Sequence, residues 1–160
     1  MDATDLDTFV DALIDDLTPA AVRDGDRTLF HLLDSPRRIL DDEAVVAVLA
    51  AAVTLRNLAD HVIASAVVAA ERAAIPARQH LRTGTDLLTS IGVAPGAAHR
   101  AVRVGRAAHT LPALTAQQRL GAVGIEFADA VGKGISHITS RVALSEEDRA
   151  EIVTTLMTQT

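Results

Sequence analysis

The sequence predicts an all-α protein, a helical bundle around one long central helix with a helix-turn-helix-like unit in its second half. Apolar residues recur every three or four positions over most of the chain, which is the period of a helix. No two alternating segments flank a hairpin turn, as a β-sheet would require. The stretch from Asp41 to about Ala74 lacks glycine and proline and ends before Pro76, so one long helix is expected there.

The length of 160 residues fits a single domain. We expect residues 1–76 to form acidic N-terminal helices and the long alanine-rich helix, residues 77–131 the helix-turn-helix-like unit, and residues 145–158 a terminal helix. No glycine or proline follows the last apolar residues, so we expect the natural protein to continue and this chain to be a fragment of it.

The N-terminal region predicts an amphipathic helix from Leu6 to Leu17 and a short helix at Leu29–Leu33. In the long helix, small and branched residues step alternately by four and three positions. The seam consists of Val48, Ala52, Leu55, Ala59, Val62, Ala66, Ala69 and Ala73. Such a seam is typical of the central helix of a bundle; the alternative is a coiled coil that would join two copies into a homodimer through this helix.

The composition excludes several classes of protein. Without cysteine there is no disulfide framework, cysteine-ligated zinc or thiol nucleophile. Three Phe and no Tyr or Trp leave little to stack on single-stranded nucleic acid. The N-terminus is acidic where a signal peptide is basic. The longest uncharged apolar run, Ala44–Leu55, is too short to span a bilayer and predicts a buried helix. We therefore expect a cytoplasmic protein without a membrane partner.

The helix-turn-helix-like unit is predicted from three consecutive signals. Asp86–Ile91 has the apolar spacing of a short helix, Gly92–Ala94 is a turn, and Pro95 begins a second helix that runs to about His109. A short helix, a three-residue turn with glycine and a longer helix are the outline of a helix-turn-helix.

The second helix of this unit carries the candidate site, a basic face. Arg103, Arg106 and His99 share that face, with Arg100 at its edge, and the preceding loop adds Arg82. Residues 61–119 hold seven arginines and two acids. Basic side chains on a helix that docks by its apolar side can contact the phosphates or guanines of double-stranded DNA. The same arginines could instead form a solvated face or pair with the acidic N-terminal region.

The C-terminal region predicts a helix from Thr115 to about Ala130 and a loop or frayed helix end at Gly132–Gly134. The last helix begins at Ser145, where a hydroxyl is followed three residues later by Asp148 in the pattern of a capping box.

No catalytic, metal or cofactor site is expected. The six histidines have neither metalloprotease nor zinc-finger spacing. The loop around Lys133 lacks the spaced glycines of a phosphate-binding loop, and the acidic runs fit helix starts better than paired catalytic carboxylates. The chain is therefore expected not to be an enzyme.

Two stretches of the sequence resemble a known family. They are Leu87–Leu114, which includes Ile91–Pro95 and Ala98–Ala107, and Gly121–Val131. Both resemble the actinobacterial domain of unknown function 222, which precedes an HNH nuclease module in mycobacterial repeat-family proteins. The resemblance implies an actinobacterial (Mycobacterium-type) origin and an association with DNA through that module, but assigns no catalytic residue to this chain.

Two functions are therefore expected. The first is a non-catalytic DNA-binding or targeting module of an HNH-nuclease-associated protein. The alternative is an oligomerisation or protein-interaction scaffold without direct DNA contact, as the alanine-rich seam and the overall acidity suggest.

Overall fold

The computed structural model describes residues 41–158, and every described element is a helix. The expected helices at Leu6–Leu17 and Leu29–Leu33 lie outside the described residues. The elements are α3 (Asp42–Arg72), α4 (Ile75–Arg78), α5 (Gly84–Ser90), α6 (Pro95–Ala107), α7 (Pro112–Arg119), α8 (Ile125–Thr139) and α9 (Glu146–Thr158). Residues 41–158 contain no strand, so the all-α prediction is confirmed for this part of the chain.

The chain divides into two units, residues 1–53 and 54–160. In the first unit the described residues form the start of α3, where Asp41 Oδ1 accepts a hydrogen bond of 2.8 Å from the backbone N–H of Ala44. A carboxylate at this position satisfies one of the free N–H groups at the helix N-terminus. Within this unit Val48 is buried, whereas Val46 and Leu49 are exposed.

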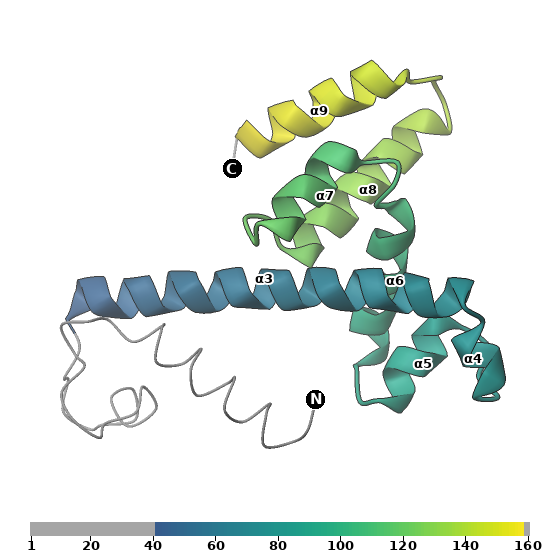
Figure 1. Cartoon of the computed structure of the whole chain (residues 1–160). Helices are drawn as coiled ribbons and strands as arrows, with labels where there is room; N and C mark the ends of the chain where they lie inside the picture. The colour runs from purple at the N-terminus through teal and green to yellow at the C-terminus, as the bar shows by residue number, and fades with distance from the viewer. Residues whose placement is uncertain (1–40, 159–160) are drawn as a thin grey trace, which may run out of the picture. The chain divides into compact units, whose positions relative to one another are not determined.

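The second unit is built around α6. It packs on α5 and on α8, while α7 packs on α9. Figure 1 shows α6 crossing the C-terminal half of α3, with α4 and α5 on one side of that helix and α7, α8 and α9 on the other. Its core is made of aliphatic side chains from six helices, as the scarcity of aromatic residues requires. The members are Ala64, Val67, Val68, Leu88, Ala98, Ala101, Val102, Val104, Leu111, Leu114, Ile125, Ala128, Val131, Ile135 and Val153.

The crossing of α3 and α6 depends on Gly105. A Cβ atom at this position would overlap the backbone carbonyl oxygen of Ala64 and lie 2.8 Å from Val68 Cγ2. Ala64 itself is only 1% exposed. Glycine is therefore the residue that lets the two backbones approach this closely.

The face of α3 that packs in this unit differs from the predicted seam. The buried residues are Asn57, Ala64, Val67 and Val68. Of the seam residues in the unit, Leu55 is half-buried; the exposed ones are Ala59, Val62, Ala66, Ala69 and Ala73. The long helix was predicted correctly. The interpretation of the seam as the buried side of a bundle's central helix is wrong for this unit, because α6 covers a different stripe; the coiled-coil alternative stays a prediction.

The helix-turn-helix outline agrees with the structure to within two residues at each end. The short helix begins at Gly84, because Thr83 accepts a hydrogen bond of 3.1 Å from the N–H of Asp86 as the N-cap. The turn closes through a 3.0 Å bond from Val93 N–H to Leu88 C=O, and α6 starts at Pro95. Because α6 also packs on α3 and α8, it is an internal helix with only part of its circumference in solvent.

The single helix predicted from Thr115 to about Ala130 is wrong, because the structure has two helices in this region. Pro112 begins α7, which ends at Arg119, and α8 begins only at Ile125. Between them Gly121 has a φ of 70°, and its carbonyl accepts a hydrogen bond of 2.9 Å from buried Asn57 Nδ2. A positive φ ends a helix, and glycine adopts it without steric cost.

The loop predicted at Gly132–Gly134 is also wrong, because these residues lie inside α8. Each glycine costs a helix about 1 kcal/mol relative to alanine. Burial of Ile125, Ala128, Val131 and Ile135 along one side of α8 offsets that cost. The predicted capping box at α9 is confirmed: Asp148 N–H donates to Ser145 Oγ, and Ser145 N–H donates to Asp148 Oδ2, both at 3.0 Å.

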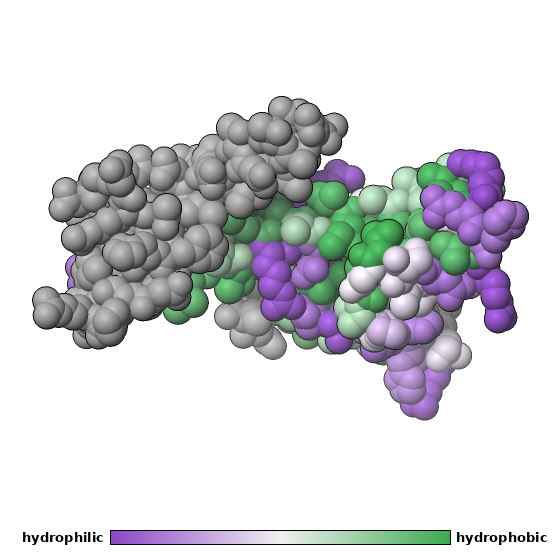
Figure 2. Space-filling model, turned by 90° about the horizontal axis from the view of Figure 1, so that it is seen from below, coloured by the Kyte–Doolittle hydropathy of each residue, from purple (hydrophilic) through white to green (hydrophobic). Residues whose placement is uncertain are grey.

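One described helix, α3, is long and apolar enough by length and composition to cross a membrane. Of residues 44–55 only Val48 is buried and most of the others are exposed, so the prediction of a buried helix around Ala44–Leu55 was wrong for most of this stretch. In Figure 2, apolar side chains gather in the middle of the visible part of the surface and hydrophilic ones lie beside them. The most exposed large apolar side chains of the second unit include Val62, Ile91 and Leu120.

Candidate functional site

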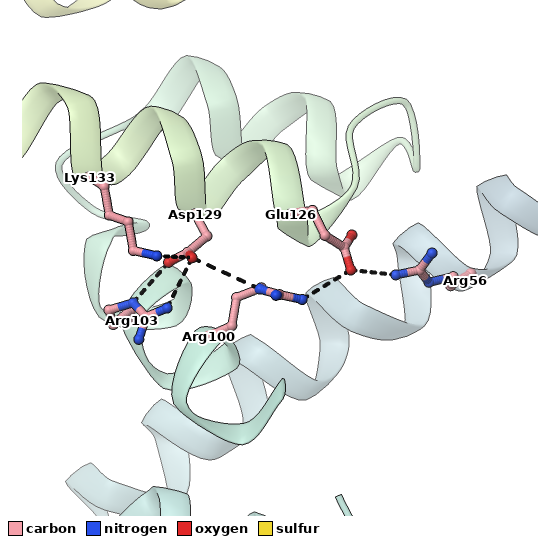
Figure 3. Close-up of polar contacts among 6 residues, drawn as sticks. All are labelled: Arg56, Arg100, Arg103, Glu126, Asp129 and Lys133. Atoms are coloured by element: carbon pink, nitrogen blue, oxygen red, sulfur yellow. Dashed lines mark hydrogen bonds and ion pairs between the residues drawn. The ribbon is translucent and has the colours of Figure 1, made fainter. Parts of the chain in front are cut away.

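The three arginines of the predicted basic face are all held by acidic side chains of the same unit. They follow one another at intervals of three residues on α6. Figure 3 shows two of them, Arg100 and Arg103, pointing to carboxylates on α8. The acids that hold them, Glu71, Glu126 and Asp129, come from α3 and α8 of the second unit and not from the acidic N-terminal region that was the predicted alternative partner.

Arg103 makes a bidentate contact with Asp129. Its Nε and Nη2 donate two parallel hydrogen bonds of 2.9 Å to Oδ1 and Oδ2 of Asp129. Bidentate pairs of this kind are among the stronger and more directional contacts in proteins. The Asp129 side chain is only 8% exposed, whereas that of Arg103 is 48% exposed. The carboxylate thus lies behind the guanidinium and fixes its plane.

Asp129 holds two further cations. Lys133, one turn later on α8, places Nζ 2.7 Å from Asp129 Oδ2, and Arg100 Nε lies 3.9 Å from the same oxygen. The hydrogen bond from Arg103 lowers the pKa of Asp129, and the bond from Lys133 adds to this, while burial acts in the opposite direction. The carboxylate therefore stays ionised and anchors a group with an excess of positive charge.

Glu126 links Arg100 to α3. Its Oε1 accepts a hydrogen bond of 3.1 Å from Arg100 Nη1 and another from Arg56 Nη2 (Figure 3). Asp60, one turn beyond Arg56, lies 3.6 Å from Arg56 Nε through Oδ2, but that buried oxygen accepts no hydrogen bond from the described residues. Burial raises the pKa of Asp60, with Glu126 adding to the rise and Arg56 and Arg100 opposing it.

Arg106 is held by Glu71 of α3. Its Nε and Nη2 lie 3.0 and 2.7 Å from Oε2 and Oε1 of that carboxylate. Glu71 Oε1 also accepts a 3.0 Å bond from the backbone N–H of Gly84, the first residue of α5. The hydrogen bond from Arg106 is the largest cause of the lowered pKa of Glu71. One carboxylate therefore ties α3, α5 and α6 together.

These pairs leave donors free on the solvent side. Arg103 and Arg106 each use Nε and Nη2, and among residues 41–158 neither Nη1 has a hydrogen-bond partner. The side chains of Arg106 and Lys133 are 60% and 61% exposed. The ion pairs therefore orient Arg103, Arg106 and Lys133 and leave these three cations accessible to solvent.

The three cations border one groove. It lies between α6 and α8 and has a volume of about 650 Å³. Apolar Val104, Ala107 and Ala128 form part of its lining beside the charged and polar side chains. Ser136 and His137 of α8, and Ser140 directly after its end, extend the row that begins with Asp129 and Lys133. The lining thus combines three cations, one carboxylate, two hydroxyls and an imidazole.

The other predicted contact residues do not join this groove. His99 and Arg82 are exposed, and within the described ranges neither side chain forms a hydrogen bond or ion pair. The loop bases Arg78 and His80 are exposed as well; Arg78 donates to the carbonyl of Ala73, and His80 has a φ of 57°.

The sequence did not reveal the α8 side of the groove. The helix predicted from the sequence ended at about Ala130. That prediction therefore placed Lys133, Ser136, His137 and Ser140 in or beyond a loop. They follow Asp129 in successive steps of three or four residues, and this spacing is the signal that could have found them, because such residues share one helix face.

Comparisons with known proteins give no relative. No protein-family model matches the chain, and neither a curated protein nor a solved structure matches it. The resemblance to the actinobacterial domain of unknown function 222 stays a prediction. The part of the chain that the structure describes has no group of three or more His, Asp or Glu side chains placed to hold a metal ion.

Proposed function

We propose that this chain is a non-catalytic module that binds the phosphate backbone of double-stranded DNA, in a protein associated with an HNH nuclease. The observation that carries the proposal is the arrangement of Arg103, Arg106 and Lys133 around one groove, each oriented by a carboxylate that contacts it from one side. Exposed cations with free donors are what phosphate oxygens require.

The charge distribution supports this proposal. Residues 54–144 contain ten basic and five acidic side chains. Four of those acids, Asp60, Glu71, Glu126 and Asp129, already contact basic groups. The excess of positive charge would attract DNA and would make the affinity depend on salt.

The packing of α6 favours phosphate contact over reading of bases. A recognition helix enters the major groove with its outer face. Here α6 is in contact with α5 and α8, crosses α3 closely, and has its arginines tied to acids on the neighbouring helices. Binding through the backbone positions a protein on DNA without specifying sequence. His99 and Arg82 would then add peripheral contacts beside the groove.

We place this function in the cytoplasm, despite the apolar character of α3. The middle of α3 contains Arg56, Asn57 and Asp60, which contact residues of the second unit or lie near them. A transmembrane position would carry the charges of Arg56 and Asp60 into hydrocarbon, at a cost of about 2.5–3.5 kcal/mol each on insertion scales. Their contacts with Glu126 and Gly121 favour an aqueous environment.

The deciding experiment is a fluorescence-anisotropy titration of labelled duplex DNA at about 50 and about 200 mM salt. We expect binding that weakens steeply with salt and falls about tenfold or more in the Arg103→Gln, Arg106→Gln double variant. Arg119→Gln, an exposed arginine of α7 outside the groove, is the matched control and should bind as the unaltered chain does. Circular dichroism checks that each variant is folded.

Absence of binding at the lower salt would contradict the proposal. So would a double variant that folds and binds DNA as well as the control.

The alternative function, an oligomerisation or protein-interaction scaffold, has one observation in its favour. From Ala59 to Ala73 the residues of the predicted seam of α3 are exposed, and Val62 among them is 62% exposed. A second copy could cover this stripe and form a symmetric dimer. Analytical ultracentrifugation tests it: a dimer that dissociates in Ala66→Glu would support the scaffold, and a monomer at micromolar concentration would contradict it.

A further inference from the structure

We infer that the groove between α6 and α8 is a site for a single phosphate group, bound by Arg103, Arg106 and Lys133, with Ser136 and His137 as further hydrogen-bond donors. The inference rests on the proposed function where the phosphate belongs to DNA. It goes beyond that function because it adds Ser136 and His137 of α8 to the binding residues, and because a free phosphate compound could occupy the same site.

The first argument is the balance of charge inside the groove. Its lining holds Arg103, Arg106 and Lys133 against the single carboxylate of Asp129. Glu71, which pairs with Arg106, is not part of the lining. An anion entering the groove therefore meets an excess of positive charge, with the carboxylate already engaged.

The second argument is preorganisation. Asp129 Oδ2 accepts both from Arg103 Nη2 at 2.9 Å and from Lys133 Nζ at 2.7 Å, so one oxygen holds two cations side by side. Arg106 is fixed by its own bidentate contact with Glu71. Cations held in place before binding lose less conformational entropy when an anion arrives.

The third argument is the set of unused donors along α8. The Ser136 hydroxyl and the His137 ring border the groove, and neither makes a side-chain hydrogen bond to any other residue in the range 41–158. Ser140 also lies there, but its hydroxyl already donates to the carbonyl of His137. Ser136 and His137 can therefore turn toward a bound oxygen without breaking a contact.

The size of the groove fits a phosphate that carries a substituent. Its volume of about 650 Å³ exceeds what one phosphate fills and is open to solvent. A backbone phosphate with its sugars, or a small phosphorylated compound, could enter from the solvent side. The shared chemistry is the phosphate group, and the experiment separates the two sources.

The experiment uses two probes on the whole chain. Inorganic pyrophosphate is titrated while the NMR resonances of His137 are followed, after assignment by a His137→Gln variant. Duplex DNA is titrated by anisotropy. Both probes are applied to the unaltered chain, to Lys133→Gln and to the control Arg119→Gln. Lys133 is an exposed helix residue, so the substitution should preserve the fold, which circular dichroism verifies.

We expect pyrophosphate to shift the His137 resonances in the unaltered chain and in the control, and not in Lys133→Gln. For DNA, we expect Lys133→Gln to weaken binding and to lower the slope of log affinity against log salt by about 0.9, the loss of one phosphate contact. Both results together would identify the groove as a contact point for the DNA backbone.

The remaining outcomes separate this inference from the proposed function. If pyrophosphate shifts the His137 resonances but the chain binds no DNA, the phosphate site would be supported, with a free phosphate compound as its ligand. The same result would contradict the proposed DNA-binding function. Equal DNA affinity in Lys133→Gln and the unaltered chain would contradict phosphate binding in the groove. It would leave the proposed DNA-binding function uncontradicted. Unchanged His137 resonances during the pyrophosphate titration of the unaltered chain would also overturn the inference.

Discussion

Arg103 of α6 and Asp129 of α8 form a bidentate ion pair in which the carboxylate is buried and the guanidinium is half-exposed. The pair joins two helices that pack on each other in the core of the second unit. It therefore has two effects: it stabilises the contact between α6 and α8, and it turns a charged side chain toward the groove. The first effect can be tested on stability alone.

Replacing Asp129 by asparagine should destabilise the protein, and replacing Asp60 should not. Asp129→Asn leaves Arg103 and Lys133 without their carboxylate, which should cost about 1.5–3 kcal/mol, the range for hydrogen bonds to charged groups. Asp60 has a buried oxygen without a hydrogen-bond partner in the described residues, and burial raises its pKa. Asp60→Asn should therefore leave the melting temperature unchanged or raise it.

Thermal unfolding followed by circular dichroism at pH 7 measures both variants. The two substitutions remove the same charge from the same residue type, so each is the control for the other. Equal losses of melting temperature in the two variants would show that the contacts of Asp129 stabilise the protein no more than those of Asp60.

The stability of the second unit should fall in acid. The arginine hydrogen bonds lower the pKa values of Asp129 and Glu71 in the folded protein below their ordinary values. A carboxyl group with a depressed folded pKa stabilises the protein above its unfolded pKa, and that stabilisation is lost as the pH falls toward the folded pKa. Melting temperatures should therefore drop as the pH is lowered through about 4, the ordinary range of these groups.

A series of melts between pH 7 and pH 3 tests this dependence. The double variant Asp129→Asn, Glu71→Gln should start from a lower melting temperature and show a smaller drop over the same interval. A drop of the same size in the double variant would assign the acid sensitivity to other carboxyl groups.

Two glycines of α6 should respond in opposite ways to alanine. Gly105→Ala places a methyl group against the carbonyl of Ala64 and against Val68, so α3 and α6 must move apart. We expect a loss of about 1–3 kcal/mol, as for other overpacked cores. Gly96 lies in the first turn of the same helix with no atom near the position of a Cβ, so Gly96→Ala should stabilise by up to about 1 kcal/mol. Chemical denaturation measures both, and a stable Gly105→Ala would contradict the close crossing.

The helices were predictable from the sequence where a local signal marks their ends. Pro95 starts α6, and the Ser145–Asp148 box starts α9, because proline and capping side chains act on their own neighbourhood. The continuation of α8 through Gly132 and Gly134 was missed, since it depends on burial of Ile135 against distant residues. Local propensity is weaker than that tertiary contribution.

The candidate site was predictable only on one side. The spacing of Arg100, Arg103 and Arg106 marks a basic helix face without any structure. Their partners could not be predicted, because Glu71 and Asp129 are separated from them by 35 and 26 residues. Only the packing of α3 and α8 on α6 brings these acids within reach. Lys133 joined the site for the same reason.

Removing the charge of Glu126 should strengthen DNA binding if the cationic cluster around it contacts phosphates. This cluster consists of Arg56, Arg100, Arg103, Arg106 and Lys133. Glu126 is half-exposed and contacts both Arg56 and Arg100, so it neutralises part of the charge next to the groove. Glu126→Gln would free these guanidiniums for phosphate contacts, and we expect a several-fold gain in affinity with a steeper salt dependence. Glu147→Gln, on the exposed start of α9, makes the same change of net charge away from the cluster and serves as the control. Anisotropy at two salt concentrations compares them, and equal gains in both variants would show that only the net charge of the chain matters, not the position of the cluster.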